Sequence, residues 1–220
     1  MQKQFSEAIA FIKHHQDGEV AEMLRYRGLQ YNMIYGVSSS LLYDYAKKHP
    51  KNQELSRKLW EQDFREAKLL ALMLADPKTI EIQELQSIIY SFTNHEMVEI
   101  ASLHLLPHIP FAIDRAYEWI QDEREFVKMT GYMLANRVAN RIKHVNFRDL
   151  SKFLPEYERD FTHGSFFVRN AVINAFQEVA FRNPGLKGPI EQATKRVLAK
   201  NEGTEFELLA KDMLQVLNYC

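Results

Sequence analysis

The residues most able to do chemistry are gathered between positions 92 and 106, where FTNHEMVEIASLHLL carries two carboxylates and two imidazoles. Thr93, followed three residues later by Glu96, matches a capping box, which predicts a helix start with Glu96 bonded to its first turn. At about 100° per residue, one helix face would carry polar groups and the opposite face mainly apolar ones. The predicted polar face consists of His95, Glu99 and Ser102, and the opposite one of Met97, Ile100, Ala101 and His104.

A metal site is the first alternative for this stretch. The pattern His95-Glu96-x-x-Glu99 lacks the second histidine of His-Glu-x-x-His, and His104 falls on the opposite face of the predicted helix. Cys220 is the only cysteine, so a cysteine-based zinc site within the chain is excluded. We therefore expect neither a metal nor a cofactor, and the candidate groups reduce to acid–base or electrostatic chemistry.

The composition limits the classes of partner. The 220 residues are 46% hydrophobic, and 28 basic against 29 acidic residues give a net charge of -1. Such a chain has no global field that attracts nucleic acid or an anionic membrane, so any basic surface must be local. Without an apolar run near the ~20 residues of a membrane span, we expect a cytoplasmic monomer with no membrane contact.

The elements that would position the candidate groups are helices. Apolar residues recur at spacings of three and four, as in Leu69, Leu70, Met73 and Leu74, whereas strand-like alternation is missing over any useful length. Prolines and glycines mostly fall between the periodic segments, and no low-complexity linker divides them. The sequence predicts an all-α protein with a single domain over residues 1–220.

Internal repeats predict how the helices are arranged. A Trp-x-Gln-Asp-x-Arg-Glu pattern occurs at residues 60–66 and again at 119–125, and Phe126-Val127-Lys128 recurs as Phe167-Val168-Arg169, 41 residues later. These offsets are typical of HEAT-type helix pairs. Equivalent positions of stacked pairs form rows, so Lys68, Lys128 and Arg169 could make a basic ladder on one face. The alternative is that they are ordinary solvated side chains.

A family resemblance rests on several motifs in order along the chain. They are Tyr35-Gly36-Val37, Ala46-Lys47-Lys48, Glu54-Leu55, Leu59-Trp60 and the helix start Arg65-Glu66-Ala67-Lys68. The chain resembles the DNA alkylation repair glycosylases of the AlkD type, more weakly toward residue 184. The resemblance implies a right-handed superhelical stack of HEAT-like (ARM-type) repeats whose concave face holds duplex DNA. Tyr43 departs from the arginine that is usual in the family.

The same resemblance implies which residues would act. Glu99 takes the position of the family's cleft aspartate and His95 that of a cleft tryptophan, while Met129 and Asn174 replace an arginine and a second tryptophan. Hydrolysis of N3- or N7-alkylpurine glycosidic bonds needs a carboxylate near the developing sugar cation, and aromatic faces would add cation–π attraction. With three of four positions changed, we expect weak or absent excision. Phosphate contacts would come from Lys68, Lys128, Arg137, Arg141 and Arg169.

Two functions therefore stay open on the sequence alone. The first is a DNA alkylation repair-like protein that binds duplex DNA and in which Glu99 contributes any remaining glycosylase activity. The second is a non-catalytic helical-repeat scaffold that binds a protein partner, in which Glu99 lies on a solvated helix face. The near-zero net charge favours the scaffold, whereas a local row of basic residues would favour DNA.

Overall fold

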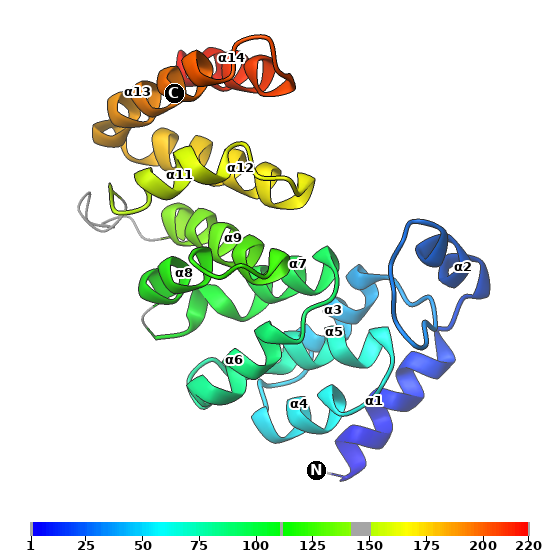
Figure 1. Cartoon of the computed structure of the whole chain (residues 1–220). Coiled ribbons are helices and arrows are strands. Elements are labelled where there is room, and N and C mark those ends of the chain that lie inside the picture. Colours follow the sequence, from blue (N-terminus) through cyan, green and yellow to red (C-terminus); the bar gives the residue numbers. More distant parts are fainter. Residues whose placement is uncertain (1, 111, 142–150, 220) are drawn as a thin grey trace. The chain divides into compact units, whose positions relative to one another are not determined.

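The computed structural model describes residues 2–110, 112–141 and 151–219, and every regular element in these ranges is helical (Figure 1). The prediction of an all-α fold is confirmed for this part of the chain. Two compact units, Met1–Pro110 and Phe111–Cys220, are distinguishable, and each is described by itself below. That the chain acts as a single domain stays a prediction.

The first unit contains seven α-helices and a short 3₁₀ turn within its described residues. The helices differ in length from 8 to 13 residues, and most begin at a residue whose side chain accepts a bond from the first turn. Their bounds are α1 Gln2–His14, α2 Gly18–Tyr26, α3 Ser39–Lys47, α4 Gln53–Trp60, α5 Arg65–Leu74, α6 Ile82–Tyr90, α7 His95–His104 and η1 Leu106–His108.

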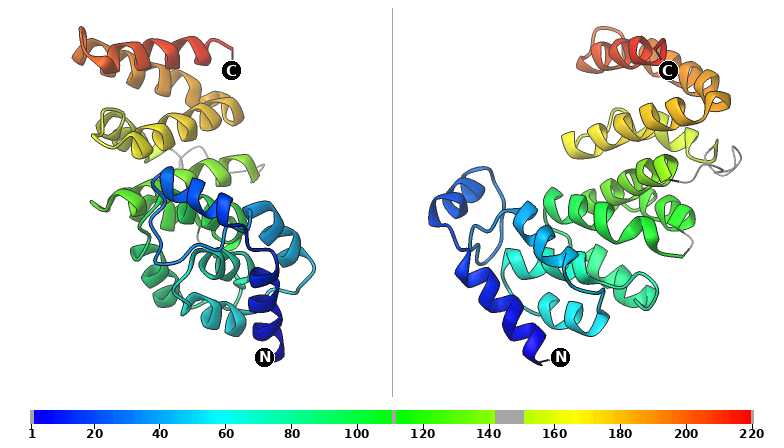
Figure 2. Two further views of the ribbon diagram at one scale, coloured as in Figure 1. Left: turned by 90° about the vertical axis from the view of Figure 1, so that its right-hand side faces the viewer. Right: turned by 180° about the vertical axis from the view of Figure 1, so that it is seen from behind.

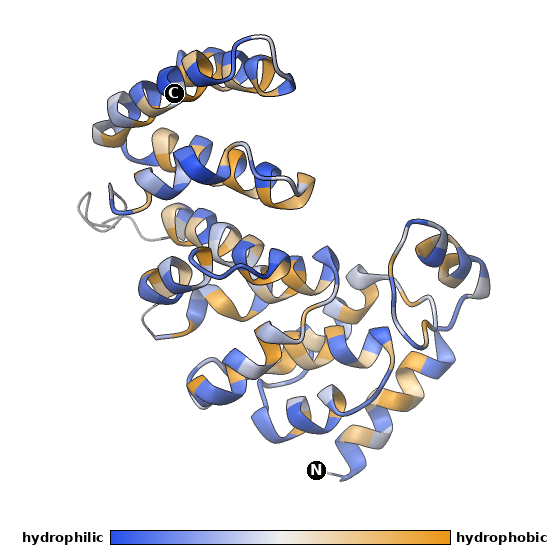
Figure 3. Cartoon of the chain, viewed as in Figure 1, coloured by the Kyte–Doolittle hydropathy of each residue, from blue (hydrophilic) through white to orange (hydrophobic). Residues whose placement is uncertain are grey.

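Helix α5 forms the centre of this unit. Nine of its ten residues are buried, with Lys68 as the exception, and it packs against α3, α4 and α7. Its alanines, leucines and methionine are strong helix formers, and a helix that is apolar nearly all round must lie inside. Figure 3 shows the alternation of hydrophobic and hydrophilic residues along the surrounding helices, as expected for elements with one buried face. Groups held by α5 are therefore fixed relative to its neighbours.

The second unit consists of helix pairs. Within each pair and between α9 and α12 the helices lie against each other, as all views in Figures 1 and 2 show. Their bounds are α8 Ala112–Ile120, α9 Glu125–Arg141, α11 Leu154–Asp160, α12 Phe166–Arg182, α13 Pro184–Lys200 and α14 Glu205–Leu217.

The repeat alignment agrees with these pairs. The predicted equivalent helices were expected to begin near Arg65, Arg124 and Ser165. They are α5, α9 and α12. Each is the second helix of a pair, and the first helices of these pairs are α4, α8 and α11, respectively. The offsets of 59 and 41 residues in the sequence thus correspond to repeated helix pairs, which is the HEAT-like architecture.

Gly131 sets how closely α8 approaches α9. A Cβ at this position would lie 2.7 Å from the carbonyl oxygen of Ala116 and 2.7 Å from the backbone nitrogen of Ile120. Gly188 in α13 offers a comparison, since a Cβ there would have nothing within 4 Å. Glycine is thus required by the packing at Gly131 and only tolerated at Gly188.

We expect Gly131→Ala to lower the free energy of unfolding by more than about 1 kcal/mol, because the new methyl group overpacks a rigid backbone contact. Gly188→Ala should instead raise it by up to about 1 kcal/mol through helix propensity. Urea unfolding of both variants beside the wild type measures the two effects. Equal shifts of the same sign would contradict the close α8–α9 approach.

Candidate functional site

A buried carboxylate at the start of α5 anchors the segment that precedes α3. Glu66 is fully buried and accepts hydrogen bonds from the backbone N–H groups of Tyr35 (3.0 Å), Gly36 (2.9 Å) and Val37 (3.3 Å). A carboxylate needs such donors when it leaves water, because an unpaired buried charge is costly. The Tyr-Gly-Val motif and the Arg-Glu helix start are therefore two halves of one contact.

Glycine is the only residue type that can occupy position 36 in this contact. Its φ is +83°, in the left-handed region, and a Cβ would lie 1.9 Å from the carbonyl oxygen of Asp17. The neighbouring Asp17 N–H donates to the Tyr35 carbonyl (2.8 Å). The turn at Gly36 thus packs directly on the start of α2, which no side chain would permit.

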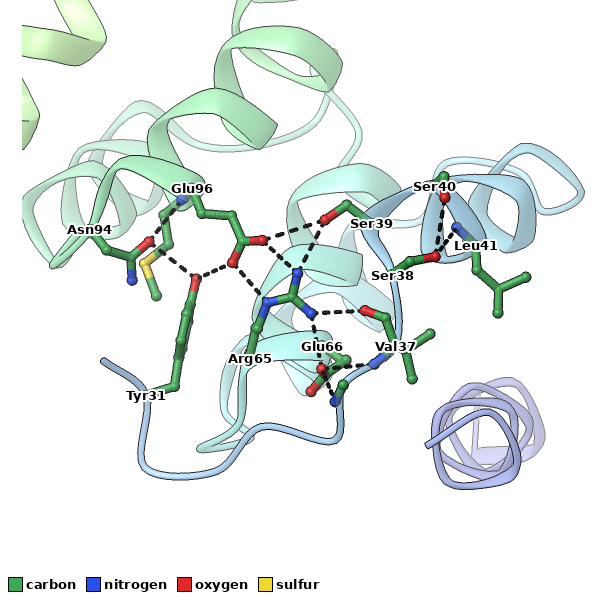
Figure 4. A network of polar contacts seen from close by, with 12 residues as sticks. Tyr31, Val37, Ser38, Ser39, Ser40, Leu41, Arg65, Glu66, Asn94 and Glu96 are labelled. Atoms are coloured by element: carbon green, nitrogen blue, oxygen red, sulfur yellow. Dashed lines mark hydrogen bonds and ion pairs between the residues drawn. The ribbon is translucent and has the colours of Figure 1, made fainter. Parts of the chain in front are cut away.

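Arg65 connects the same segment to α7 (Figure 4). Its guanidinium makes a bidentate pair with Glu96, Nε to Oε2 at 2.8 Å and Nη2 to Oε1 at 2.5 Å, and it also donates to the Val37 carbonyl (2.8 Å) and to Glu66 (3.0 Å). Only 2% of Arg65 is exposed. Although burial opposes its charge, the hydrogen bonds that it donates to Glu96 and the charges of Glu96 and Glu66 raise the pKa of Arg65.

Glu96 corrects one sequence-based prediction. The residue that caps α7 is Asn94, whose Oδ1 accepts the Met97 N–H at 3.1 Å, and not Thr93. Glu96 turns away from the helix end to Arg65 and accepts further bonds from Tyr31 (3.2 Å) and Ser39 (3.4 Å). The predicted capping box is wrong because a buried guanidinium is a stronger partner for a carboxylate than the helix's own backbone.

The side chains of α7 differ in exposure. Glu99 is exposed, so its predicted outward direction is confirmed, whereas His95 is half-buried. Ser102 is wholly buried, against prediction, and its Oγ has no hydrogen-bond partner among the described residues. His104 is half-buried and stacks on Tyr43 with ring centroids 4.6 Å apart. The outward face of α7 therefore consists of His95, Glu99 and Leu103, which is 43% exposed.

The basic ladder occupies equivalent positions but has another role. Lys68 donates to the Trp60 carbonyl at the end of α4, and Lys128 donates to the Ile120 carbonyl (2.8 Å) at the end of α8. Arg169 bonds the carbonyls of His163 (2.6 Å) and Gly164 (2.9 Å) before α12. Each cation thus satisfies carbonyls that the preceding helix or turn leaves unpaired, where the helix dipole also favours positive charge.

Lys128 requires a correction as a phosphate-binding candidate. It is 2% exposed, and its ammonium lies 3.4 Å from Asp160, a residue that the sequence analysis missed. Asp160 also accepts bonds from Tyr132 (2.7 Å) and Arg159 (2.8 Å). Burial alone would raise the pKa of Asp160, but these bonds and the Lys128 charge lower it below its usual value. A lysine held in this way cannot reach DNA phosphates.

The remaining predicted positions lie in the second unit. Arg137 is half-buried on α9 and forms no ion pair with a described residue, while the side chain of Arg141 lies outside the described residues. Met129, which stands where the resemblance has an arginine, is buried. Asn174 is exposed on α12, and its carbonyl accepts a bond from Asn136 (2.9 Å). The structure thus leaves Arg137 and Asn174 accessible.

A pocket of about 420 Å³ lies beside Lys68 in the first unit. The Lys68 ammonium is 4.7 Å from the centroid of the Trp60 ring, and burial lowers the pKa of Lys68, partly offset by Asp63. The wall is lined by Gln30, Tyr31, Asn32, Trp60, Asp63, Phe64, Lys68, Ser91, Thr93 and Met97. Met97, the lining residue that belongs to α7, is on the side of that helix opposite Glu99, so this pocket and the predicted carboxylate are separate features.

Two kinds of site are missing from the described ranges. No cluster of three His, Cys, Asp or Glu side chains that could hold a metal ion occurs there. Likewise, none of the described helices has the length and apolarity that crossing a membrane requires.

Comparisons with known proteins agree with the HEAT-like architecture. The family model of the DNA alkylation repair enzymes matches residues 5–188. A solved structure is similar with a TM-score of 0.77 and 20% identity, covering 88% of this chain and 83% of its own. That protein is described as one of a new family related to the HEAT-like repeat DNA glycosylases, with affinity for branched DNA structures. A designed armadillo repeat protein aligns at a TM-score of 0.40 and 14% identity, covering 90% of this chain and 100% of its own. No curated protein sequence matches the chain.

The site geometry yields a matched pair of substitutions on α7. We expect Glu96→Gln to lower the free energy of unfolding by about 3 kcal/mol, because it leaves Arg65 buried without its counter-charge. Glu99→Gln should change it by less than about 0.5 kcal/mol, since Glu99 is exposed. Denaturant unfolding of the two variants, three residues apart on one helix, measures the contrast. Equal losses would contradict the buried role assigned to Glu96.

Proposed function

Because this chain belongs to the family of DNA alkylation repair enzymes, we propose that it is a DNA-binding HEAT-like repeat protein whose excision of alkylated purines is slow. The observation that carries this proposal is the separation of two sets of residues. Arg65, Glu66 and the turn at Gly36, which carry the family resemblance, hold the fold together. The positions that would act on a lesion have mostly changed.

The chemistry left to α7 is electrostatic. Hydrolysis of an N7- or N3-alkylpurine breaks the bond between the sugar C1′ and the base, which leaves with the bonding electrons, while water adds to C1′ and loses a proton. In the proposed mechanism Glu99 stabilises the sugar cation and accepts that proton. Its exposure leaves it free to do so, but its longer side chain and the His95 neighbour provide poorer positioning than an aspartate beside tryptophan.

DNA binding is proposed to use few direct phosphate contacts. Lys128 is excluded by burial, and Lys68 and Arg169 already bond backbone carbonyls. Among the described side chains of the predicted set, the half-buried Arg137 is the one that has no ion pair or hydrogen bond with another described residue. The similar protein of known structure is described as having affinity for branched DNA structures, and we propose that this chain, which carries little net charge, binds DNA by its shape.

We expect Arg137→Glu to weaken binding to duplex and branched DNA by a similar factor and to reduce the salt slope by about one, because one phosphate contact is lost. Fluorescence anisotropy between low and moderate salt measures both. Lys3→Glu, at an exposed position of α1, is the charge-matched control and should bind as the wild type does. Absence of binding to every DNA at low salt would overturn the proposal and favour a protein-binding scaffold.

We expect the wild type to release 7-methylguanine and 3-methyladenine from methylated duplex DNA slowly, and Glu99→Gln to remove whatever activity is measured. The reason is that Glu99 supplies the one carboxylate of the predicted site. Chromatography of the released bases under single-turnover conditions is the measurement, with Glu22→Gln, an exposed acid on α2, as control. Release that is undiminished in Glu99→Gln would show that another group acts.

A further inference from the structure

One exposed face of α12 consists of uncharged residues. Arg182, at the end of the helix, lies beside this face, with its guanidinium carbon 5.2 Å from the centroid of the Phe181 ring, and is paired with Glu178. Phe166, Asn170, Asn174, Gln177 and Phe181 follow one another at spacings of three or four residues, so they share one face of the helix. This face is opposite the buried side formed by Val168, Val172, Ala175 and Val179. Phe166 and Phe181 are 65% and 57% exposed and are separated by about 22 Å along the helix axis at 1.5 Å per residue.

The three amide side chains between the phenyl rings are free. Asn170 and Asn174 are exposed and Gln177 is half-buried, and none of the three side chains has a hydrogen-bond partner among the described residues. The adjacent α9 contributes Asn136 and Asn140, whose amides bond the Asn174 carbonyl (2.9 Å) and Arg182 (3.1 Å). The contact from Asn136 holds α12 beside α9, so the free amides are presented on a fixed support.

Folding alone does not account for this composition. Asparagine is a poorer helix former than alanine, lysine or glutamate, and phenyl rings that stay 65% and 57% exposed bury little apolar surface. A face that served only solubility would carry charges, as the exposed side of α13 does with Lys187, Glu191, Lys195 and Arg196. Free amides flanked by rings instead offer donors, acceptors and stacking surfaces without charge.

We infer that this face of α12 binds the unpaired bases of DNA. Amide side chains match the donor and acceptor edges of bases, and phenyl rings stack on bases that have left a helix. Paired duplex presents chiefly phosphates to such a surface, and the cation beside the face, Arg182, is already paired with Glu178. Two rings about 22 Å apart do not form a continuous apolar patch of the kind that a protein partner or second copy would cover. The inference rests on the proposed function and names its substrate class as DNA with unpaired segments.

The test compares two probes of equal length, a fully paired duplex and one with a central unpaired stretch of three adenines, by fluorescence anisotropy. We expect the wild type to bind the second probe about tenfold more tightly or better. Phe166→Ala/Phe181→Ala should abolish that preference while leaving paired-duplex affinity within about twofold, since stacking is the interaction removed. Leu208→Ala/Gln215→Ala on α14, which removes one exposed apolar and one exposed amide side chain, should keep the preference.

The outcomes separate the two proposals. Binding to both probes with equal affinity in the wild type, or a preference that survives in Phe166→Ala/Phe181→Ala, overturns the assignment of this face and leaves the proposed DNA binding intact. A lack of binding to either probe overturns both. A variant that loses affinity for both probes alike, with an unchanged circular-dichroism melting curve, shows that the rings contact DNA without selecting unpaired bases and also overturns the inference.

Discussion

The bidentate ion pair between Arg65 and Glu96 is the constraint on which the first unit depends. A guanidinium that is 2% exposed must have its donors satisfied, and here they reach Glu96 on α7, Glu66 on α5, and the Val37 carbonyl and Ser39 hydroxyl near the start of α3. Three elements that are distant in sequence are thereby held at one point. Glu96 and Glu99 are three residues apart and lie on neighbouring sides of α7, but Glu96 is buried by its pairing with Arg65 while Glu99 stays exposed.

Such a pair specifies geometry more than it adds stability. Removing two charges from water is costly, and the attraction between them returns that cost only when every remaining donor and acceptor is bonded. Tyr31 and Ser39 complete the shell of Glu96, and three backbone N–H groups complete that of Glu66. Two of the motifs by which the chain resembles its family, Tyr35-Gly36-Val37 and the Arg65-Glu66 helix start, belong to this network. Their role in this structure is to hold the fold together.

Basic residues at equivalent repeat positions also have a structural role. Lys68 and Lys128 bond carbonyl groups at the end of the helix before their own, Arg169 bonds two carbonyl groups of the turn before α12, and Lys128 is further paired with Asp160. A repeat protein must terminate a helix at the same place in every repeat, and a cation there satisfies the exposed carbonyl ends. Periodic charge in a helical repeat can thus be structural, whereas the surfaces left for ligands are those with free polar groups, such as the amides of α12.

The sequence by itself determined the helical class, the pairing of helices and the equivalence of α5, α9 and α12, because the periodicity of apolar residues and the repeat offsets are local signals that burial must follow. It also placed Glu99 on the outward side of α7. Only the tertiary structure decided that the side chains of Glu96, Lys128 and Ser102 are buried. Each has a polar side chain that local rules assign to solvent or to a cap, but partners 31 and 32 residues away, Arg65 and Asp160, draw the first two inside. The helical periodicity of the sequence does not predict which charged residues pair over long distances. Whether a charged side chain is buried in a pair or accessible is therefore decided only when the helices pack.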